Sequence, residues 1–343
     1  MLKTTFGQSK TGETISLYSF ENAKQMKMVL TDFGAILTQL WVPDKEGNLK
    51  DVVLGFDTLA EYEVNPTYFG AIIGRSCNRI ENGTFKINDI SYQLKKNEGE
   101  NSLHSGPEGY HLRIWKVIET TDNSITFKLD SPNGDQGYPG QLTLEVTYQL
   151  TETGIKITYT GHTDQTTIFN PTNHTYFNLN GHSSGTVLEH KLELKAQKFT
   201  PVIDSSSIPT GEIIAVKDTP MDFTTAKKVG VDIDSDYDQL NFTAGYDHNY
   251  ILDKNIDYFV KMVGDKTNIV MKAATNLAGV QFYTGNFIDK LLGKENKLYQ
   301  NHEGLCLETQ FYPNSINETN FVSPILEKDE IRIYWTTYDF SIE

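Results

Sequence analysis

The stretch "LTLEVTYQLTETGIKITYT" (residues 142–160) indicates the fold class of this chain of 343 residues. In its first half every second residue is apolar: Leu142, Leu144, Val146, Tyr148 and Leu150. After the turn signal "TETG" (151–154), the alternation returns with Ile155, Ile157 and Tyr159. A strand with one buried and one solvent-exposed face has this period of two. The stretch therefore predicts two antiparallel β-strands joined by a turn.

The same period recurs in other parts of the chain. It is present in "KLELKA" (191–196) and in "IRIYW" (331–335), where it predicts that Ile331, Ile333 and Trp335 lie together on the apolar face of a strand. Turn signals rich in Gly, Pro, Asn and Asp separate such segments, as at residues 43–48, 81–83 and 131–140.

The sequence contains no convincing amphipathic helix. Short helical turns are expected only near residues 57–63 and 222–230. Many short strands with regular turns are typical of a β-sandwich or barrel. Strand signals continue from end to end, and no Pro/Ser-rich linker divides the chain. We therefore expect an all-β fold, a single large antiparallel β-sandwich, in which residues 1–343 form one domain.

Composition limits the partners that the chain can have. The net charge of -15 argues against nucleic acid, because phosphate binding needs a basic face. No stretch approaches the roughly 18 to 20 apolar residues that cross a bilayer, and the N-terminus lacks the apolar run of a signal peptide. We therefore expect a cytoplasmic protein that does not bind membranes. In that compartment Cys77 and Cys306 are expected to be reduced and buried.

The histidine pattern does not indicate a metal site. A zinc site usually has ligands at short spacing, whereas His174, His182 and His190 are eight residues apart, roughly 26 Å along a strand. The sequence also lacks a phosphate-binding glycine loop, a G-x-S-x-G elbow and a CxxC pair. We expect neither a metal nor a cofactor. Several histidines lie among charged or small polar residues and are expected at the surface: His111, His162, His182, His190 and His302.

Polar residues set among aromatic residues form the candidate site. They occur in "GRSCNRI" (74–80), "NSLHSG" (101–106), "FNPTNHTYFNLNG" (169–181), "GYDHNYIL" (245–252), "GVQFYTGNF" (279–287) and "LETQFYPNS" (307–315). Planar hydrogen-bonding groups and aromatic rings suit the hydroxyls and the C–H face of a sugar. Between Lys156 and Lys191 there is no Lys or Arg, which makes this region poorly suited to a phosphorylated ligand.

Each of these residues also has a structural interpretation. Glu308 shares a strand face with Cys306 and Gln310; burial would raise its pKa towards the range of a general base, but it could equally be a surface carboxylate. A lone histidine is more often structural than catalytic. Arg79 could be an ion-pair partner, and Asp247 could cap a turn.

Taken together, the blocks resemble those of the aldose 1-epimerase family, in the family's order and over essentially the whole chain. The resemblance implies a large antiparallel β-sandwich with an open cleft. It also implies interconversion of the α and β anomers of free hexoses by general acid–base ring opening, without a cofactor. The block "NRI" usually follows a small or aromatic residue in the family, whereas here Ser76 and Cys77 precede it and are expected to be packing variants.

The family pattern also implies roles for individual residues. Glu308 would be the base and His174 the acid, with His174 held cationic by nearby carboxylates and supported by Asn173 and Tyr176. The remaining implied positions bind substrate: Arg79, His104, Asp247, Asn78 and Gln281. Sequence resemblance favours His174 over His104 as the proton donor to the ring oxygen.

Two other functions remain open at this stage. A hexose-6-phosphate 1-epimerase should carry several cations for the phosphate, and the blocks supply only Arg75 and Arg79. A non-catalytic carbohydrate-binding sandwich would not need Glu308 and His174 together. The preferred sugar and the oligomeric state are not indicated by the sequence.

Overall fold

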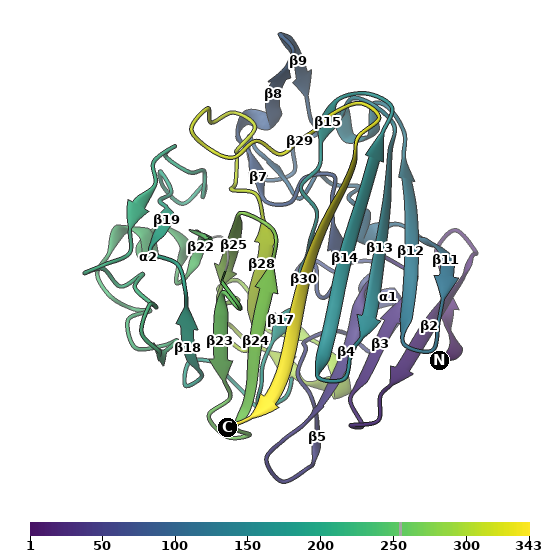
Figure 1. Cartoon of the computed structure of the whole chain (residues 1–343), viewed down its shortest axis with the longest axis vertical. Helices are drawn as coiled ribbons and strands as arrows, with labels where there is room; N and C mark the ends of the chain where they lie inside the picture. The colour runs from purple at the N-terminus through teal and green to yellow at the C-terminus, as the bar shows by residue number, and fades with distance from the viewer. Residues whose placement is uncertain (254–255) are drawn as a thin grey trace.

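The computed structural model describes residues 1–253 and 256–343, and its largest element is a nine-stranded antiparallel sheet that fans across the view in Figure 1. Its strands, in spatial order, are β11 (Lys116–Thr120), β12 (Ser124–Ser131), β13 (Leu142–Leu150), β14 (Gly154–Thr163), β30 (Ile331–Ile342), β24 (Ile269–Thr275), β23 (Val260–Val263), β18 (Lys191–Leu194) and β21 (Lys227–Lys228). The predicted pair of antiparallel strands is confirmed, because β13 pairs with β14 from Leu142↔Thr163 to Leu150↔Ile155.

Two smaller sheets form the opposite layer. One has the order β17 (Tyr176–Phe177), β28 (Leu305–Gln310), β25 (Gly279–Tyr283), β22 (Asp247–Ile251), β19 (Lys198–Thr200) and β20 (Ile214–Ala215). The other is a meander of β1 (Leu2–Gln8), β2 (Thr14–Glu21), β3 (Lys27–Thr31), β4 (Leu37–Pro43) and β5 (Leu49–Asp51).

Side chains from the two layers meet in one core. The Tyr338 hydroxyl of β30 donates to the Leu307 carbonyl of β28, and the Thr309 and Thr336 hydroxyls are 2.6 Å apart. On the other side, the Tyr148 hydroxyl donates to the Ala35 carbonyl beside β4. Two face-to-face layers that share such a core make a β-sandwich, as expected.

The remaining elements are short. Two-stranded sheets pair β6 (Ile72–Ile73) with β16 (Thr172–Asn173), β7 (Arg79–Ile80) with β10 (Ser102–Leu103), β8 (Thr84–Ile87) with β9 (Ile90–Gln93), β15 (Thr167–Ile168) with β29 (Ile325–Leu326), and β26 (Leu291–Leu292) with β27 (Leu298–Tyr299). The helices are α1 (Leu59–Tyr62) and α2 (Asp238–Thr243), with 3-10 turns at Glu81–Gly83, Tyr110–Leu112, Asp135–Gly137 and Lys294–Asn296.

The expectation of a helical turn near 57–63 is confirmed, since Thr58 and Glu61 form a capping box at the start of α1. The expectation for 222–230 is wrong, because this segment holds β21 and turns. The prediction missed α2, a short helix that packs by its buried Leu240.

The alternation in β30 was assigned to the wrong face. Ile331 and Ile333 are 66% and 53% exposed, whereas Tyr334, Thr336 and Tyr338 are buried. The reason is the register with β14, which sets Tyr334 opposite Tyr159 and Tyr338 opposite Ile155. Because residues opposite each other project to the same side of a sheet, the buried face of β14 fixes the buried face of β30.

Three histidines expected at the surface are buried. His190 accepts a hydrogen bond from the Leu179 N–H and lies 3.0 Å from Asp265, and His182 bonds the Tyr299 hydroxyl. His111 packs against Tyr68 with ring centroids 4.6 Å apart. The polar neighbours of these histidines in the sequence thus led to the wrong prediction of exposure. His162 is exposed and His302 partly exposed, as expected.

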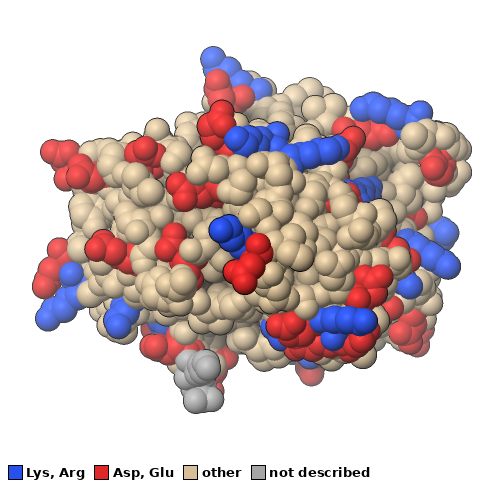
Figure 2. Space-filling view, turned by 90° about the horizontal axis from the view of Figure 1, so that it is seen from above, with Lys and Arg blue, Asp and Glu red and all other residues tan. Residues whose placement is uncertain are grey.

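The remaining expectations concern cysteines, membranes and surface charge. Cys77 and Cys306 are free and buried, as predicted. Among the helices of the described residues, none is long and apolar enough to span a membrane. On the face seen in Figure 2, the described acidic and basic side chains are interspersed and form no continuous basic patch. This face therefore offers no surface of the kind that nucleic acid requires.

Candidate active site

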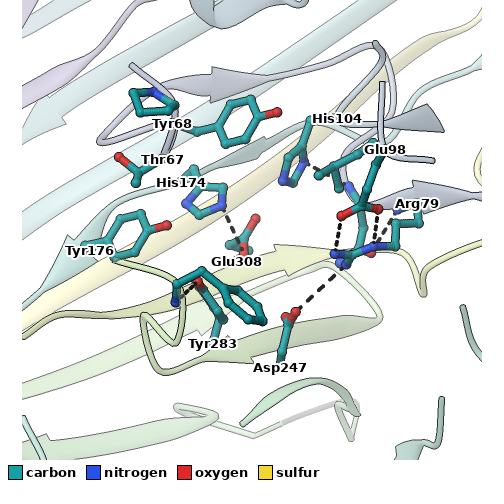
Figure 3. A pocket seen from close by; sticks show the side chains of 14 residues that line it. Thr67, Tyr68, Arg79, Glu98, His104, His174, Tyr176, Asp247, Tyr283 and Glu308 are labelled. Carbon is teal, nitrogen blue, oxygen red and sulfur yellow. Dashed lines mark hydrogen bonds and ion pairs between the residues drawn. The ribbon is translucent and has the colours of Figure 1, made fainter. Parts of the chain in front are cut away.

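An open pocket with an empty volume of about 680 Å³ lies against the six-stranded sheet and is shown in Figure 3. Its lining consists of Pro66, Thr67, Tyr68, Asn78, Arg79, Glu98, Leu103, His104, His174, Tyr176, Asp247, Tyr283, Phe287 and Glu308. Six of the seven site residues expected from the sequence thus meet in one pocket. The seventh, Gln281, does not line it but lies behind Asp247, to which its Nε2–H donates at 2.6 Å.

Asp247 and Glu308 lie on β22 and β28, the two strands that flank β25. In the pairing of β25 with β28, Gln281 lies opposite Glu308, and in the pairing of β22 with β25, Asp247 lies opposite Tyr283. Every residue of β28 is buried, so both faces of this strand are inside the molecule. The expectation that Glu308 could be a surface carboxylate is therefore excluded.

Glu308 is a buried carboxyl group next to an imidazole. Its Oε1 is 3.6 Å from His174 Nε2, and its Oε2 has no hydrogen-bond partner among the described residues. Burial raises the pKa of Glu308 well above its ordinary value, the negative charge of Asp247 raises it further, and Arg79 opposes this effect. Such a group retains its proton to higher pH than a surface glutamate and suits a general base near neutrality.

His174 follows β16 and is held by its surroundings on both ring faces and on Nδ1. Its ring stacks on Tyr176 at 5.1 Å between centroids and lies parallel to Tyr68 at 5.7 Å, while Nδ1 is 3.5 Å from Cys306 Sγ. The neighbouring Asn173 amide donates to the Gly70 carbonyl. Tyr176 thus contacts the His174 ring directly, whereas the Asn173 side chain bonds Gly70, and the roles of both as supports of His174 stay predictions.

The expectation that nearby carboxylates hold His174 cationic is wrong for the unliganded protein. Burial lowers the pKa of His174 to about 3, and this effect exceeds the opposing contribution of its backbone hydrogen bond. Loss of hydration disfavours the charged imidazole. The neighbouring Glu308 does not offset this effect, because burial also favours the protonated, uncharged form of its carboxyl group. Burial therefore favours the protonated carboxyl group of Glu308 and the neutral imidazole of His174.

The His104 ring is held through its Nδ1 atom. Its Nδ1 accepts the Asn78 N–H at 3.1 Å, so a neutral ring carries its hydrogen on Nε2. Burial lowers the pKa of His104 well below its ordinary value, which keeps the ring neutral. His104 is thus a hydrogen-bond donor, and Asn78 orients it from a backbone N–H.

Arg79 is the guanidinium group of the pocket. Its Nε and one terminal nitrogen donate to the two carboxylate oxygens of Glu98, at 2.6 and 2.8 Å. The other terminal nitrogen is 3.9 Å from Asp247 Oδ2. The interpretation of Arg79 as an ion-pair partner is confirmed. Arg79 also lines the pocket, and its role in substrate binding stays a prediction.

Sequence reasoning did not single out two residues that line the pocket, Glu98 and Tyr68. Glu98 belongs to the same Gly-rich loop as His104 and lies close to Arg79 because β7 pairs with β10. Tyr68 has a left-handed backbone (φ 59), and its ring contacts both His104 and His174. A bulky residue in this conformation is uncommon and depends on tertiary contacts, which leave no local signal in the sequence.

His104, His174 and Glu308 also form a cluster that could hold a metal ion, since one ligand atom of each lies within 4.8 Å of the others. A metal needs a nitrogen with a free lone pair. In His104 the Nδ1 lone pair is taken by the Asn78 N–H, and Nε2 carries the hydrogen. The cluster is therefore better suited to sugar hydroxyls than to a metal.

Comparisons with known proteins identify the family of this chain. The family model of aldose 1-epimerase matches residues 16–339. The galactose mutarotase of Sus scrofa is 37% identical over 99% of this chain and 98% of its own length, and the aldose 1-epimerase of Escherichia coli is 34% identical over the full length of both chains. The crystal structure of an aldose epimerase homologue from C. elegans superposes with a TM-score of 0.87 at 29% identity, covering 95% of this chain and 98% of its own.

The matches span the whole chain, and the pocket contains the residues on which the resemblance depends. This chain therefore belongs to the aldose 1-epimerase family and is an isomerase with aldose 1-epimerase activity.

Proposed function

We propose that the chain interconverts the α and β anomers of free aldohexoses, with Glu308 as general base and His174 as general acid. The observation that carries this proposal is the 3.6 Å separation of Glu308 Oε1 and His174 Nε2 in the pocket, with both groups buried. Galactose and glucose are the substrates we propose first, since the relatives include galactose mutarotases.

The ring-opening step balances within the pair of residues. The Glu308 carboxylate takes the proton of the C1 hydroxyl, and the cationic His174 donates the proton on Nε2 to the ring oxygen. The bond from C1 to the ring oxygen breaks, and C1 becomes an aldehyde. Rotation about C1–C2 and closure by the reverse transfers yield the other anomer, so no redox partner or cofactor is consumed.

The pair carries one proton throughout the reaction. Before opening it is the ion pair, and after opening it is protonated Glu308 with neutral His174, which is the state that burial favours in the unliganded protein. Sugar hydroxyls that hydrogen-bond the carboxylate stabilise its charged form and so favour the ion pair when substrate binds. The burial of both groups therefore supports ring opening.

The other pocket residues would bind and orient the sugar. The Nε2–H of His104 and the guanidinium of Arg79 are donors for sugar oxygens, and the Asp247 carboxylate is an acceptor for hydroxyls. Asn78 and Gln281 act through them, since Asn78 holds His104 and Gln281 holds Asp247. A fixed ring orientation is what proton transfer at two separate oxygens requires.

Polarimetry with fresh α-D-galactose tests the proposal. Glu308→Gln and His174→Asn should each fold normally and lower kcat by about 10²–10⁴-fold, because each removes one proton transfer. Near wild-type turnover of Glu308→Gln would rule out Glu308 as the base. A change of KM alone in His174→Asn would make His174 a binding residue.

The hexose-6-phosphate alternative is less well supported. Among the described residues that line the pocket, Arg79 is the single Lys or Arg. Arg75 is 1% exposed and donates to the Pro139 and Gly140 carbonyls instead. A direct comparison of glucose with glucose 6-phosphate as substrate separates the two functions.

A carbohydrate-binding sandwich without activity is the second alternative, and membership of the aldose 1-epimerase family argues against it. Such a module gains nothing from burying Glu308 beside His174, because burial of ionisable groups is costly. No acceleration of galactose mutarotation over buffer would favour this alternative.

We also infer that residues 1–343 act as one domain in the cytoplasm. The free, buried state of Cys77 and Cys306 supports a reducing compartment.

A further inference from the structure

We propose that Glu98 is a specificity-determining residue that excludes phosphorylated and other anionic sugars from the pocket. The proposal rests on the proposed function, because it concerns which sugars reach Glu308 and His174. Glu98 acts through Arg79, whose hydrogen-bonding groups it occupies.

The contact between Glu98 and Arg79 is the one that an anionic ligand would need. An arginine binds a phosphate or carboxylate through two parallel N–H groups of its planar fork. Here those two positions are taken by Glu98, at 2.6 Å from Nε to Oε2 and 2.8 Å from the terminal nitrogen to Oε1, as Figure 3 shows. A phosphate could use this fork only by displacing the Glu98 carboxylate.

The remaining charges of the pocket also oppose an anion. The third nitrogen of Arg79 faces Asp247 at 3.9 Å. The carboxyl groups of Glu98 and Asp247 therefore both contact Arg79, the one guanidinium among the described residues that line the pocket. A phosphate monoester carries roughly -1.5 to -2 charges at pH 7, and it would meet these carboxyl groups without a free cation.

Glu98 lies at the rim, where its charge can be removed with little effect on the core. Its side chain is 36% exposed, whereas that of Arg79 is 11% exposed. The backbone of Glu98 is held separately, because Glu98 and Asn101 exchange N–H to carbonyl hydrogen bonds at 3.3 and 2.9 Å. Glu98→Gln should therefore keep the loop and leave the Arg79 fork available to a ligand.

The experiment compares Glu98→Gln with a control from the same loop. Glu100→Gln removes an equal charge, but Glu100 is 80% exposed, pairs with Lys96 and lies outside the pocket. Glucose 6-phosphate is titrated as a competitive inhibitor of galactose mutarotation, and its binding is also measured by calorimetry. For Glu98→Gln we expect inhibition and dissociation constants at least about tenfold lower than for the wild type, since a like charge beside the ligand is gone.

Two further variants distinguish the charge from the shape of the side chain. Glu98→Asp retains the charge and should bind glucose 6-phosphate as weakly as the wild type and Glu100→Gln do. Glu98→Ala should bind it as tightly as Glu98→Gln, and it serves as the test if Glu98→Gln fails to fold. A glucose 6-phosphate affinity that is equal in the wild type, Glu98→Gln and Glu98→Ala would overturn the proposal.

The calorimetric measurement separates this proposal from the proposed function. If the wild type does not accelerate galactose mutarotation but Glu98→Gln still binds glucose 6-phosphate more tightly, the proposed catalysis is wrong and the role of Glu98 stands. If the wild type is active and glucose 6-phosphate binds it as well as it binds Glu98→Gln, the role of Glu98 is wrong and the catalysis stands.

Discussion

At the scale of single residues, Glu308 and His174 are each placed where their charged form is disfavoured. Burial raises the pKa of the carboxyl group and lowers that of the imidazole to about 3. An exposed pair of this kind would hold its proton on the histidine, whereas burial here shifts both pKa values towards a pair that holds it on the glutamate. This is the protonation state that the pair reaches after ring opening.

The pKa of Glu308 predicts a cost in stability. In the unfolded chain Glu308 ionises near its ordinary value of 4.5, but in the folded protein it keeps its proton to higher pH. Below pH 4.5 Glu308 is protonated in both states and does not lower the free energy of unfolding. As the pH rises from 4.5 towards the folded pKa, only the unfolded chain ionises, and the free energy of unfolding falls by up to about 1.4 kcal/mol per pH unit. Glu308→Gln should therefore be more stabilised relative to the wild type at pH 8 than at pH 5.

Urea unfolding of both proteins at pH 5 and pH 8 measures this difference. His174 contributes in the opposite sense, because its folded pKa is lowered and its stability is lost as pH falls below about 6.5. That contribution is common to both proteins. An equal difference in free energy of unfolding at the two pH values would contradict the raised pKa of Glu308.

The same pair predicts the pH dependence of kcat/KM. The active free enzyme carries one proton on the pair, and a second proton adds only near pH 3, the pKa of His174. The alkaline limb then reports the raised pKa of Glu308. We expect no fall in kcat/KM as the pH is lowered from 7 to about 4, in polarimetry corrected for buffer catalysis. An acid limb with an apparent pKa well above 3 would contradict the lowered pKa of His174.

At the scale of elements, Arg75 forms hydrogen bonds with several segments at one end of the nine-stranded sheet. It is 1% exposed, and its two terminal nitrogens donate to Pro139, Gly140, Thr167, Ser131 and Pro132 at 2.6–3.3 Å. Four of the six acceptor atoms are backbone carbonyls, from the last residue of β12 and from the segment between β12 and β13. The guanidinium thus donates to backbone carbonyls of that loop, which in a sheet would accept from a neighbouring strand.

Arg75→Lys should destabilise the fold without altering the pocket. Lysine has a single nitrogen and cannot span the set of acceptors, so buried carbonyls lose their donors at about 1–3 kcal/mol each. We expect a loss of about 2–4 kcal/mol in urea unfolding, with kcat for galactose retained. Arg332→Lys is the control, because Arg332 is partly exposed and pairs with Glu330; it should cost under about 1 kcal/mol. Equal losses for the two variants would contradict this role of Arg75.

The elements also show which features were readable from the sequence. The period of two located β13, β14, β18 and β30, because alternation directly reflects burial on one face. It failed for the face of β30, where Ile331 and Ile333 are exposed, because register with β14 and not hydrophobicity decides which side faces the core. The neutral state of His174 was also missed, since it depends on burial from segments far apart in the chain.

The candidate site was readable through the resemblance of its motif blocks, which brought together Glu308, His174, His104 and Arg79. The roles of these residues stay predictions. Glu98 and Tyr68 were not readable, because they come from loops. Tyr68 has a left-handed backbone. Glu98 reaches Arg79 only because β7 pairs with β10. Loop conformations of this kind are set by tertiary contacts and not by local propensity.

At the scale of the whole molecule, the strand order ties distant parts of the chain together. β30, which ends at Ile342, lies between β14 and β24 in the middle of the nine-stranded sheet, as Figure 1 shows. The pocket takes residues from Pro66 to Glu308 and depends on the layer that packs against β30. The nine-stranded sheet takes strands from both halves of the chain, which supports a single domain over residues 1–343.

A single domain predicts that the two ends of the sandwich unfold together. Trp115 is buried beside β11 and the five-stranded sheet, where its backbone N–H donates to the Asp32 carbonyl. The pocket lies against the six-stranded sheet. In a Trp41→Phe/Trp335→Phe background, Trp115 fluorescence reports on the first region and mutarotase activity on the second. Because β30 and β14 join both regions through one core, fluorescence, activity and far-UV circular dichroism should change at one urea concentration. Two separate midpoints, with the Trp115 signal persisting after circular dichroism has lost part of its amplitude, would divide the chain into independently folding units and contradict the single domain.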